Sequence, residues 1–271
     1  MNYKDEIKAI IFDFDGTLIN FEYEYSKYTL KALKLLSETD YKICLASGRP
    51  CYLALKAFRN YFGDCRIDYV FGCNGSEMMN LKENKTDILF PLKADEVQYL
   101  GKVFTDPIVT LGIYNEEEFL VNHEVSDPVI QEWMKARWVK PIVYDFTSND
   151  IERSKVLLLS NPKDRKIVEE IINNTDLSNY NSFFSSKICY EIAPKGISKA
   201  KSCELLAKEI NCDMKQILSF GDMENDLDML LATTGVAMAN ASDNIKKQIP
   251  LMTGHVEKEG IYLFLHENSL I

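Results

Sequence analysis

The sequence lacks the features that mark several protein classes. Its seven cysteines form no C-x-x-C pair, and their odd count argues against a disulfide framework or a zinc site. No apolar run is long enough to cross a bilayer, and residues 1–6 carry charges instead of an apolar signal region. We therefore expect a cytoplasmic protein with reduced thiols and no membrane partner.

Nucleotide-binding loops and metal-binding histidine clusters are also missing. The chain contains neither G-x-x-x-x-G-K-S/T nor G-x-G-x-x-G, which argues against a nucleotide kinase. His123, His255 and His266 are isolated, fit no ligand spacing and receive no role. The formal net charge of −10 argues against a nucleic-acid partner, because an acidic surface repels a phosphate backbone.

The composition is that of a globular protein with a sizeable core. The 271 residues include 46% hydrophobic and 27% charged residues, enough for one large domain or two ordinary ones. At both ends of the chain, short apolar runs that stop at turn residues alternate with helical patterns. This alternation predicts an α/β fold with a doubly wound parallel sheet. The expected strands are residues 7–12, 42–46, 68–71, 216–220 and 235–238, and the expected helices are residues 23–37, 198–209, 224–231 and 243–248.

The middle of the chain has a different pattern. Polar turns there separate apolar runs at hairpin spacing, one of them across residues 115–117, and a helix with Ser126 as a possible cap is expected at 126–136. We therefore expect an inserted α+β domain over residues 82–187, with the catalytic core formed by residues 1–81 and 188–271. Both tryptophans lie in the segment 133–140, among cations. They could face a sugar or a second phosphate, but packing within the inserted domain is the preferred interpretation.

Two aspartates follow the first expected strand. Asp13 ends it, and Asp15 lies in the turn that follows. In an open α/β sheet ligands bind beyond the carboxyl ends of the strands, so both carboxyls can reach one site. Close carboxylates repel unless a cation lies between them or one keeps its proton, and Mg²⁺ prefers oxygen ligands. Taken alone, this pair is equally well explained as a plain turn.

The next two strands end in residues that can bind phosphate. Ser47 and Gly48 follow the second strand, and Asn74 follows the third. A hydroxyl and the free N–H groups of a glycine turn can hold phosphate oxygens, and an Asn amide can donate to them. Each would be an ordinary turn if it stood alone.

The last two motifs lie in the C-terminal part of the chain. Lys199 is expected in the first turn of a helix capped by Ser198, where the helix dipole disfavours a cation, so an anionic partner would explain it. A solvated surface lysine is the alternative. Asp222, Asn225 and Asp226 follow another strand. The helix dipole alone favours acids in the first turn of a helix, which is the simpler explanation. A calcium-binding EF-hand loop is excluded, because its glycine and its glutamate are absent.

The ordered set of these motifs resembles the haloacid dehalogenase superfamily, specifically its Cof-like phosphatases with a large α/β cap (type IIB). The motif D-x-D-G-T is met at Asp13, the Ser-Gly-Arg motif at Ser47, the motif lysine at Lys199 and G-D-x-x-N-D at residues 221–226. The resemblance covers both ends of the chain. In the middle it rests only on length and on the mixture of hairpins and helices.

The resemblance implies an Mg²⁺-dependent phosphatase acting on a small phosphorylated metabolite. Asp13 would be the nucleophile and Asp15 the acid and base, while Ser47 and Lys199 hold the phosphate. Mg²⁺ would be held by the Asp13 carboxylate, the Asp15 backbone carbonyl and Asp222. The expected phosphate contacts also include Gly48, Asn74 and Asn225, with Asp226 in support.

The resemblance leaves the substrate and two alternative functions open. Sugar phosphates are the leading substrate class, followed by phosphorylated cofactors such as pyridoxal phosphate or flavin mononucleotide. A phosphotransferase or mutase of the same superfamily would pass the phosphate to another acceptor, and a metabolite-binding protein would have no catalysis. We expect a monomer or a weak homo-oligomer.

Overall fold

A computed structural model of the chain describes residues 3–115, 118–148 and 150–271. It divides into two compact units. The first, here called the core unit, comprises Met1–Asp87 and Ser198–Ile271, and the second, the inserted unit, comprises Ile88–Ile197. The expected turn at residues 115–117 includes positions outside the described residues.

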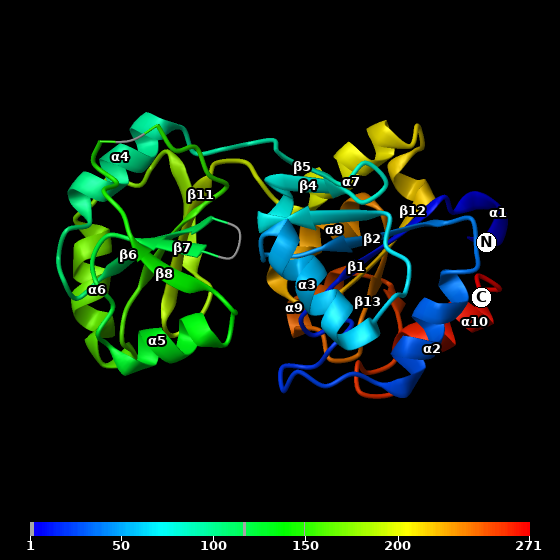
Figure 1. The fold of residues 1–271 in the computed structure, drawn as a ribbon. Coiled ribbons are helices and arrows are strands. Elements are labelled where there is room, and N and C mark those ends of the chain that lie inside the picture. Colours follow the sequence, from blue (N-terminus) through cyan, green and yellow to red (C-terminus); the bar gives the residue numbers. More distant parts are fainter. Residues whose placement is uncertain (1–2, 116–117, 149) are drawn as a thin grey trace. The chain divides into compact units, whose positions relative to one another are not determined.

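The core unit contains an eight-stranded sheet in the order β14-β13-β12-β1-β2-β3-β4-β5. The pairs from β14 to β3 are parallel, and β4 is antiparallel to β3. Figure 1 shows the early blue and cyan strands beside the late orange strands, which confirms the predicted α/β class with a parallel sheet. The strands are β1 (Ala9–Asp13), β2 (Lys42–Ala46), β3 (Tyr69–Gly72), β4 (Glu77–Asn80), β5 (Lys85–Ile88), β12 (Ile217–Gly221), β13 (Thr234–Ala237) and β14 (Leu251–Met252).

Helices cover both faces of this sheet because its central strands are apolar on both sides. In β1, Ile10 and Phe12 belong to the cluster with α2, α3 and α10, while Ala9 and Ile11 belong to the cluster with α7 and α8. All four are fully buried, as expected for a parallel strand between two layers. The helices are α1 (Tyr3–Glu6), α2 (Lys27–Leu36), α3 (Cys51–Phe62), α7 (Lys199–Glu209), α8 (Leu227–Ala232), α9 (Asp243–Gln248) and α10 (Gly260–Glu267), with short 3-10 turns η1 (Cys73–Gly75), η3 (Met214–Gln216) and η4 (Glu224–Asp226).

The inserted unit has its own six-stranded sheet, in the order β10-β11-β9-β6-β7-β8. Its pairs are antiparallel except β7–β8, and α4 and α6 pack against an apolar cluster that includes Leu111, Ile113 and Leu158. The strands are β6 (Thr110–Asn115), β7 (Glu118–Val121), β8 (Lys140–Val143), β9 (Val156–Leu159), β10 (Tyr180–Phe184) and β11 (Cys189–Pro194), and the helices are α4 (Ala94–Val103), α5 (Pro128–Lys135), η2 (Pro162–Asp164) and α6 (Arg165–Asn173).

The two units divide later in the chain than residues 82 and 187. The division lies after Asp87 and after Ile197, because β5 lies beside β4 in the core sheet and β11 pairs with β9 in the second sheet. Strand partners across the sheet decide the division, and the local sequence does not reveal them.

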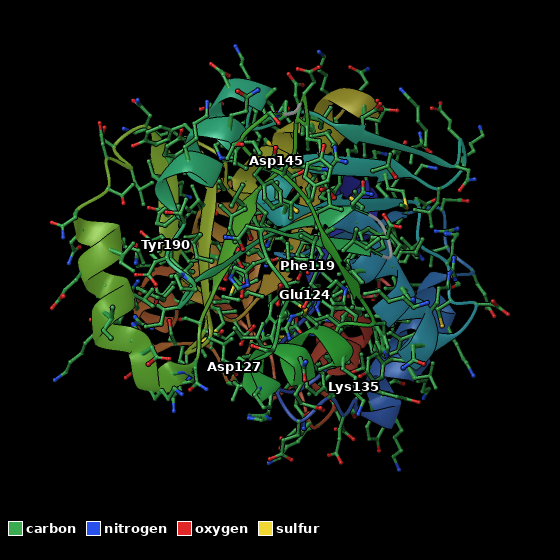
Figure 2. All side chains as sticks on the ribbon, turned by 60° about the vertical axis from the view of Figure 1, so that its left-hand side comes forward. Phe119, Glu124, Asp127, Lys135, Asp145 and Tyr190 are labelled. Atoms are coloured by element: carbon green, nitrogen blue, oxygen red, sulfur yellow. The ribbon has the colours of Figure 1, made fainter. Side chains whose placement is uncertain are left out.

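The cap of α5 also differs from the expected Ser126. The Asp127 side chain accepts hydrogen bonds from the N–H groups of Val129, at 2.8 Å, and Ile130. Asp127 and Lys135 mark the two ends of this helix in Figure 2. The two tryptophans differ in exposure, because Trp133 is buried and Trp138 is 43% exposed. The expected packing within the inserted unit is therefore observed for Trp133 alone of the two.

Candidate active site

The candidate residues of the core unit follow four neighbouring parallel strands. Asp13 ends β1, Ser47 follows β2, Asn74 lies in the turn after β3, and Asp222 follows β12. These strands are adjacent in the order β12-β1-β2-β3. Because the carboxyl ends of parallel strands meet at one edge of the sheet, the four side chains converge there.

Lys199 lies beside Asp13 at this edge. Its side chain is only 1% exposed, and its Nζ donates to Asp13 Oδ1 and to Asp226 Oδ1, each at 2.5 Å. The other oxygen of Asp226 accepts from the backbone N–H groups of Asp222 and Met223 at 3.0 Å. Two buried carboxylates therefore explain why a cation stands in the first turn of α7.

Three buried aspartates form the acidic part of the site. Asp13, Asp222 and Asp226 each offer a carboxylate oxygen, and these oxygens lie within 4.8 Å of one another. Oxygen donors of this kind, at this spacing and away from water, fit a hard cation such as Mg²⁺. The supporting role expected of Asp226 stays a prediction, and the structure adds that its carboxylate lies within this cluster.

The ionisation of this cluster is strongly perturbed. Burial and the neighbouring Asp226 raise the pKa of Asp13 well above the ordinary aspartate value, and the same causes raise the pKa of Asp222 to about 7. Burial lowers the pKa of Lys199, but Asp13 and Asp226 raise it by more, so its pKa is higher than usual. The two aspartates thus keep the lysine charged. The single lysine does not supply enough positive charge to bring the pKa values of Asp13 and Asp222 down to the ordinary aspartate value.

Asp222 is held by partners that sequence reasoning missed. Thr17 Oγ1 donates to its Oδ1 at 3.2 Å, and Asn240 Nδ2 donates to its Oδ2 at 3.3 Å. The same Asn240 amide donates to the backbone oxygen of Gly16 at 2.7 Å. Gly16 has a φ of 95°, and a Cβ there would overlap the Asp222 carboxylate, so the motif requires glycine. Thr17 belongs to the D-x-D-G-T motif, but no sequence pattern indicates the contacts that Thr17 and Asn240 make with Asp222.

The side chain of Asp15 lies outside the acidic cluster. Its two oxygens accept from Arg49, from Nε at 3.0 Å and from Nη2 at 2.5 Å. The predicted role of Asp15 as a metal ligand concerned its backbone carbonyl and stays a prediction. Arg49 was part of the Ser-Gly-Arg motif but had no assigned role, because nothing in the sequence indicated its partner.

The turns after β2 and β3 are joined to each other. Ser47 Oγ accepts from the N–H of Arg49 at 3.1 Å, and Ser47 O accepts from the N–H of Asn74 at 3.0 Å. A Cβ at Gly48 would contact Asn74 Oδ1 at 3.5 Å, and Asn225 Nδ2 lies 3.4 Å from that same oxygen. Asn74 has a φ of 55°, a left-handed conformation that asparagine tolerates better than most residues. Four of the five candidate phosphate-binding positions, Ser47, Gly48, Asn74 and Asn225, are therefore neighbours.

Comparison with known proteins places the chain in a family. The fold and the buried cluster at the strand ends define a doubly wound α/β enzyme with an inserted second unit. A family model described as haloacid dehalogenase-like hydrolase matches residues 10–265, so the chain belongs to the haloacid dehalogenase-like hydrolases.

Several relatives of this hydrolase are named as phosphatases. A protein of Buchnera aphidicola whose name includes the word phosphatase is 27% identical, over 97% of this chain and 96% of that protein. The HMP-PP phosphatase of Yersinia pseudotuberculosis is 24% identical, over 94% and 93% of the two chains. The structure of a sugar phosphatase of subclass IIB shares the fold, with a TM-score of 0.76, 19% identity and coverage of 97% and 100%. The predicted family, fold class and enzyme class are confirmed. Among the described residues, no helix is long and apolar enough to cross a membrane.

Proposed function

We propose that this phosphatase hydrolyses a small phosphorylated metabolite through a phosphate ester formed on Asp13. The observation that carries the proposal is the position of Asp13: it ends β1, is 5% exposed, and touches the Lys199 ammonium at 2.5 Å. A carboxylate nucleophile needs a cationic environment for the phosphate oxygens that approach it, and the lysine supplies part of that environment.

The first step breaks the ester bond of the substrate. An Asp13 oxygen bonds to phosphorus, the bond between phosphorus and the leaving oxygen breaks, and Asp15 gives that oxygen a proton. In the second step Asp15 takes a proton from water, whose oxygen attacks phosphorus and releases inorganic phosphate and the Asp13 carboxylate. Asp15 thus returns to its protonated form, and the two steps balance.

The neighbouring side chains hold the transferring group. Lys199 and Ser47 would contact the phosphate oxygens, with Gly48, Asn74 and Asn225 completing the contacts, because phosphoryl transfer depends chiefly on positioning and charge. Asp226 holds Lys199 in place by the 2.5 Å contact to Nζ.

Mg²⁺ is the proposed cofactor. The Asp13 and Asp222 carboxylates, with the Asp15 backbone carbonyl, would hold it. When bound, it neutralises charge between the nucleophile and the phosphate. The raised pKa values of Asp13 and Asp222 support this proposal, because burial and then the neighbouring Asp226 disfavour their charged forms, and a divalent cation would favour them.

The proposed substrate class is the sugar phosphates, and the inserted unit is the proposed source of specificity. A neighbour with this fold is a sugar phosphatase, and a relative carries the name HMP-PP phosphatase. Both proteins are named as phosphatases, and the name of the first gives sugars as its substrate class.

The test is Asp13→Asn, assayed with p-nitrophenyl phosphate and Mg²⁺. The amide keeps the shape of the side chain but is a poor nucleophile, so we expect turnover to fall at least about 1,000-fold while the circular dichroism spectrum stays unchanged. Dialysis against EDTA should abolish parental activity, and added Mg²⁺ should restore it. Retained turnover in Asp13→Asn would remove Asp13 from this role. Release of inorganic phosphate in proportion to nitrophenol separates hydrolysis from transfer.

A further inference from the structure

Arg49 makes a two-point contact with the proposed proton donor. Nε and Nη2 of its guanidinium approach the two oxygens of Asp15 at 3.0 and 2.5 Å. A planar fork that binds both oxygens fixes the plane of a carboxyl group as well as its position. A single contact would leave the carboxyl free to rotate.

The arginine itself is anchored to the phosphate-binding turns. Its backbone N–H donates to Ser47 Oγ at 3.1 Å, and its carbonyl accepts from the N–H of Cys73 at 2.8 Å. Its guanidinium lies 5.3 Å from the centre of the Phe14 ring, which is fully buried in the core cluster. Phe14 precedes Asp15 in the chain, so one arginine holds two successive residues of the first motif against the turn after β2.

We propose that Arg49 is a positioning residue that orients the Asp15 carboxyl for proton transfer to the leaving oxygen. This inference rests on the proposed function, in which Asp15 is the acid. Each carboxyl oxygen can make more than one hydrogen bond, so the contact with Arg49 leaves room for the transferred proton. Direct phosphate binding by Arg49 is the competing explanation, and the choice of substrates separates the two.

The proposal predicts an effect that depends on the leaving group. A proton donor helps most when the leaving oxygen is basic, and least when it leaves readily as an anion. Phenyl phosphate and p-nitrophenyl phosphate present nearly the same shape and the same phosphate, but phenolate is the more basic leaving group. Loss of orientation at Asp15 should therefore impair phenyl phosphate more strongly, whereas loss of phosphate binding should impair both esters equally.

The experiment compares Arg49→Lys with the parent enzyme on both esters, with Mg²⁺ present. Lysine keeps the charge but offers a point contact instead of a fork. We expect kcat/KM for phenyl phosphate to fall at least about tenfold more than kcat/KM for p-nitrophenyl phosphate, within the range of about 100- to 10,000-fold that general acid catalysis supplies. The difference should appear in kcat/KM, because hydrolysis of the phosphate ester on Asp13 is the same reaction for both substrates. The matched control is Arg59→Lys in the last turn of α3. Arg59 donates to two backbone oxygens, at 2.9 and 3.1 Å, and the effect of its replacement should be equal and small for both esters.

Asp15→Asn separates failure of this inference from failure of the proposed function. If Asp15 is the acid, Asp15→Asn shows the same preference for the better leaving group, and combining it with Arg49→Lys adds little. The role of Arg49 alone would be overturned if Arg49→Lys lowered kcat/KM equally for both esters while Asp15→Asn clearly preferred the better leaving group. Equal losses in Asp15→Asn would overturn the proposed role of Asp15 and with it this inference. Thermal melting of each variant identifies any loss that is due to unfolding.

Discussion

Replacing Lys199 with methionine should destabilise the core unit. The Nζ of Lys199 lies 2.5 Å from oxygens of Asp13 and Asp226, and all three side chains are at least nine-tenths buried. The aspartate oxygens lie within 4.8 Å of each other, so at an effective dielectric constant of about 20 their repulsion is on the order of 3 kcal/mol. Breaking a buried ion pair generally costs about 3–5 kcal/mol, which agrees with this figure. We expect the free energy of unfolding of the metal-free protein to fall by that amount at pH 7.

The assay is urea unfolding in EDTA, followed by two signals. Both tryptophans of the chain, Trp133 and Trp138, lie in the inserted unit, so their fluorescence reports that unit, while far-ultraviolet circular dichroism reports both. Lys199→Met should shift the circular dichroism transition more than the fluorescence transition. It should also abolish turnover of p-nitrophenyl phosphate.

Two further variants test whether the buried charges cause the loss of stability. Lys195→Met removes an exposed lysine whose Nζ donates to the backbone oxygen of Ser178 at 3.0 Å, and it should leave stability and turnover unchanged. Adding Asp226→Asn to Lys199→Met removes one of the two repelling charges, and with it their mutual repulsion, and should recover most of the lost stability. The reasoning is refuted if Lys199→Met unfolds at the same urea concentration as the parent.

Two further predictions concern Asp222 and Asp127. The folded-state pKa of Asp222 is about 7, above its ordinary value of 3.8, so the folded protein binds more protons than the unfolded chain between these pH values. Metal-free protein should therefore lose stability as the pH rises from about 4 to about 7. Over that range, the melting temperature of Asp222→Asn should exceed that of the parent by an increasing margin. A difference in melting temperature that is independent of pH would contradict this. Asp127→Ala should cost about 1 kcal/mol by uncapping α5, whereas Ser126→Ala should cost nothing measurable in the same urea titration, and the reverse order would restore Ser126 as the cap.

The core fold was predictable because its strands carry their signal locally. β1 is a continuous apolar run that ends at Asp13, and β12 is apolar apart from Ser219 and ends before Asp222. A strand buried on both faces needs such an apolar run. The inserted unit was harder to predict. All four residues of β8 are exposed, and β10 alternates between exposed and half-buried residues, so neither strand shows the apolar pattern from which strands are predicted.

The sequence alone determined the kinds of groups at the site and the edge of the sheet where they would meet. Asp13, Ser47, Asn74 and Asp222 each follow a parallel strand, and parallel strands end at a common edge whatever the rest of the chain does. The same reasoning identified Lys199 as a lysine in need of an anionic partner, because its place in the first turn of a helix is unfavourable.

Only the tertiary structure decided which group contacts which. Lys199 is 186 residues from Asp13 in the chain, and Arg49 is 34 residues from Asp15, so no local spacing links either pair. Asp226 joins the buried acids because its carboxylate also accepts the backbone N–H groups of Asp222 and Met223, which turns it towards the ammonium. Contacts between side chains from distant strands depend on the packing of the whole core, and a sequence motif does not record that packing.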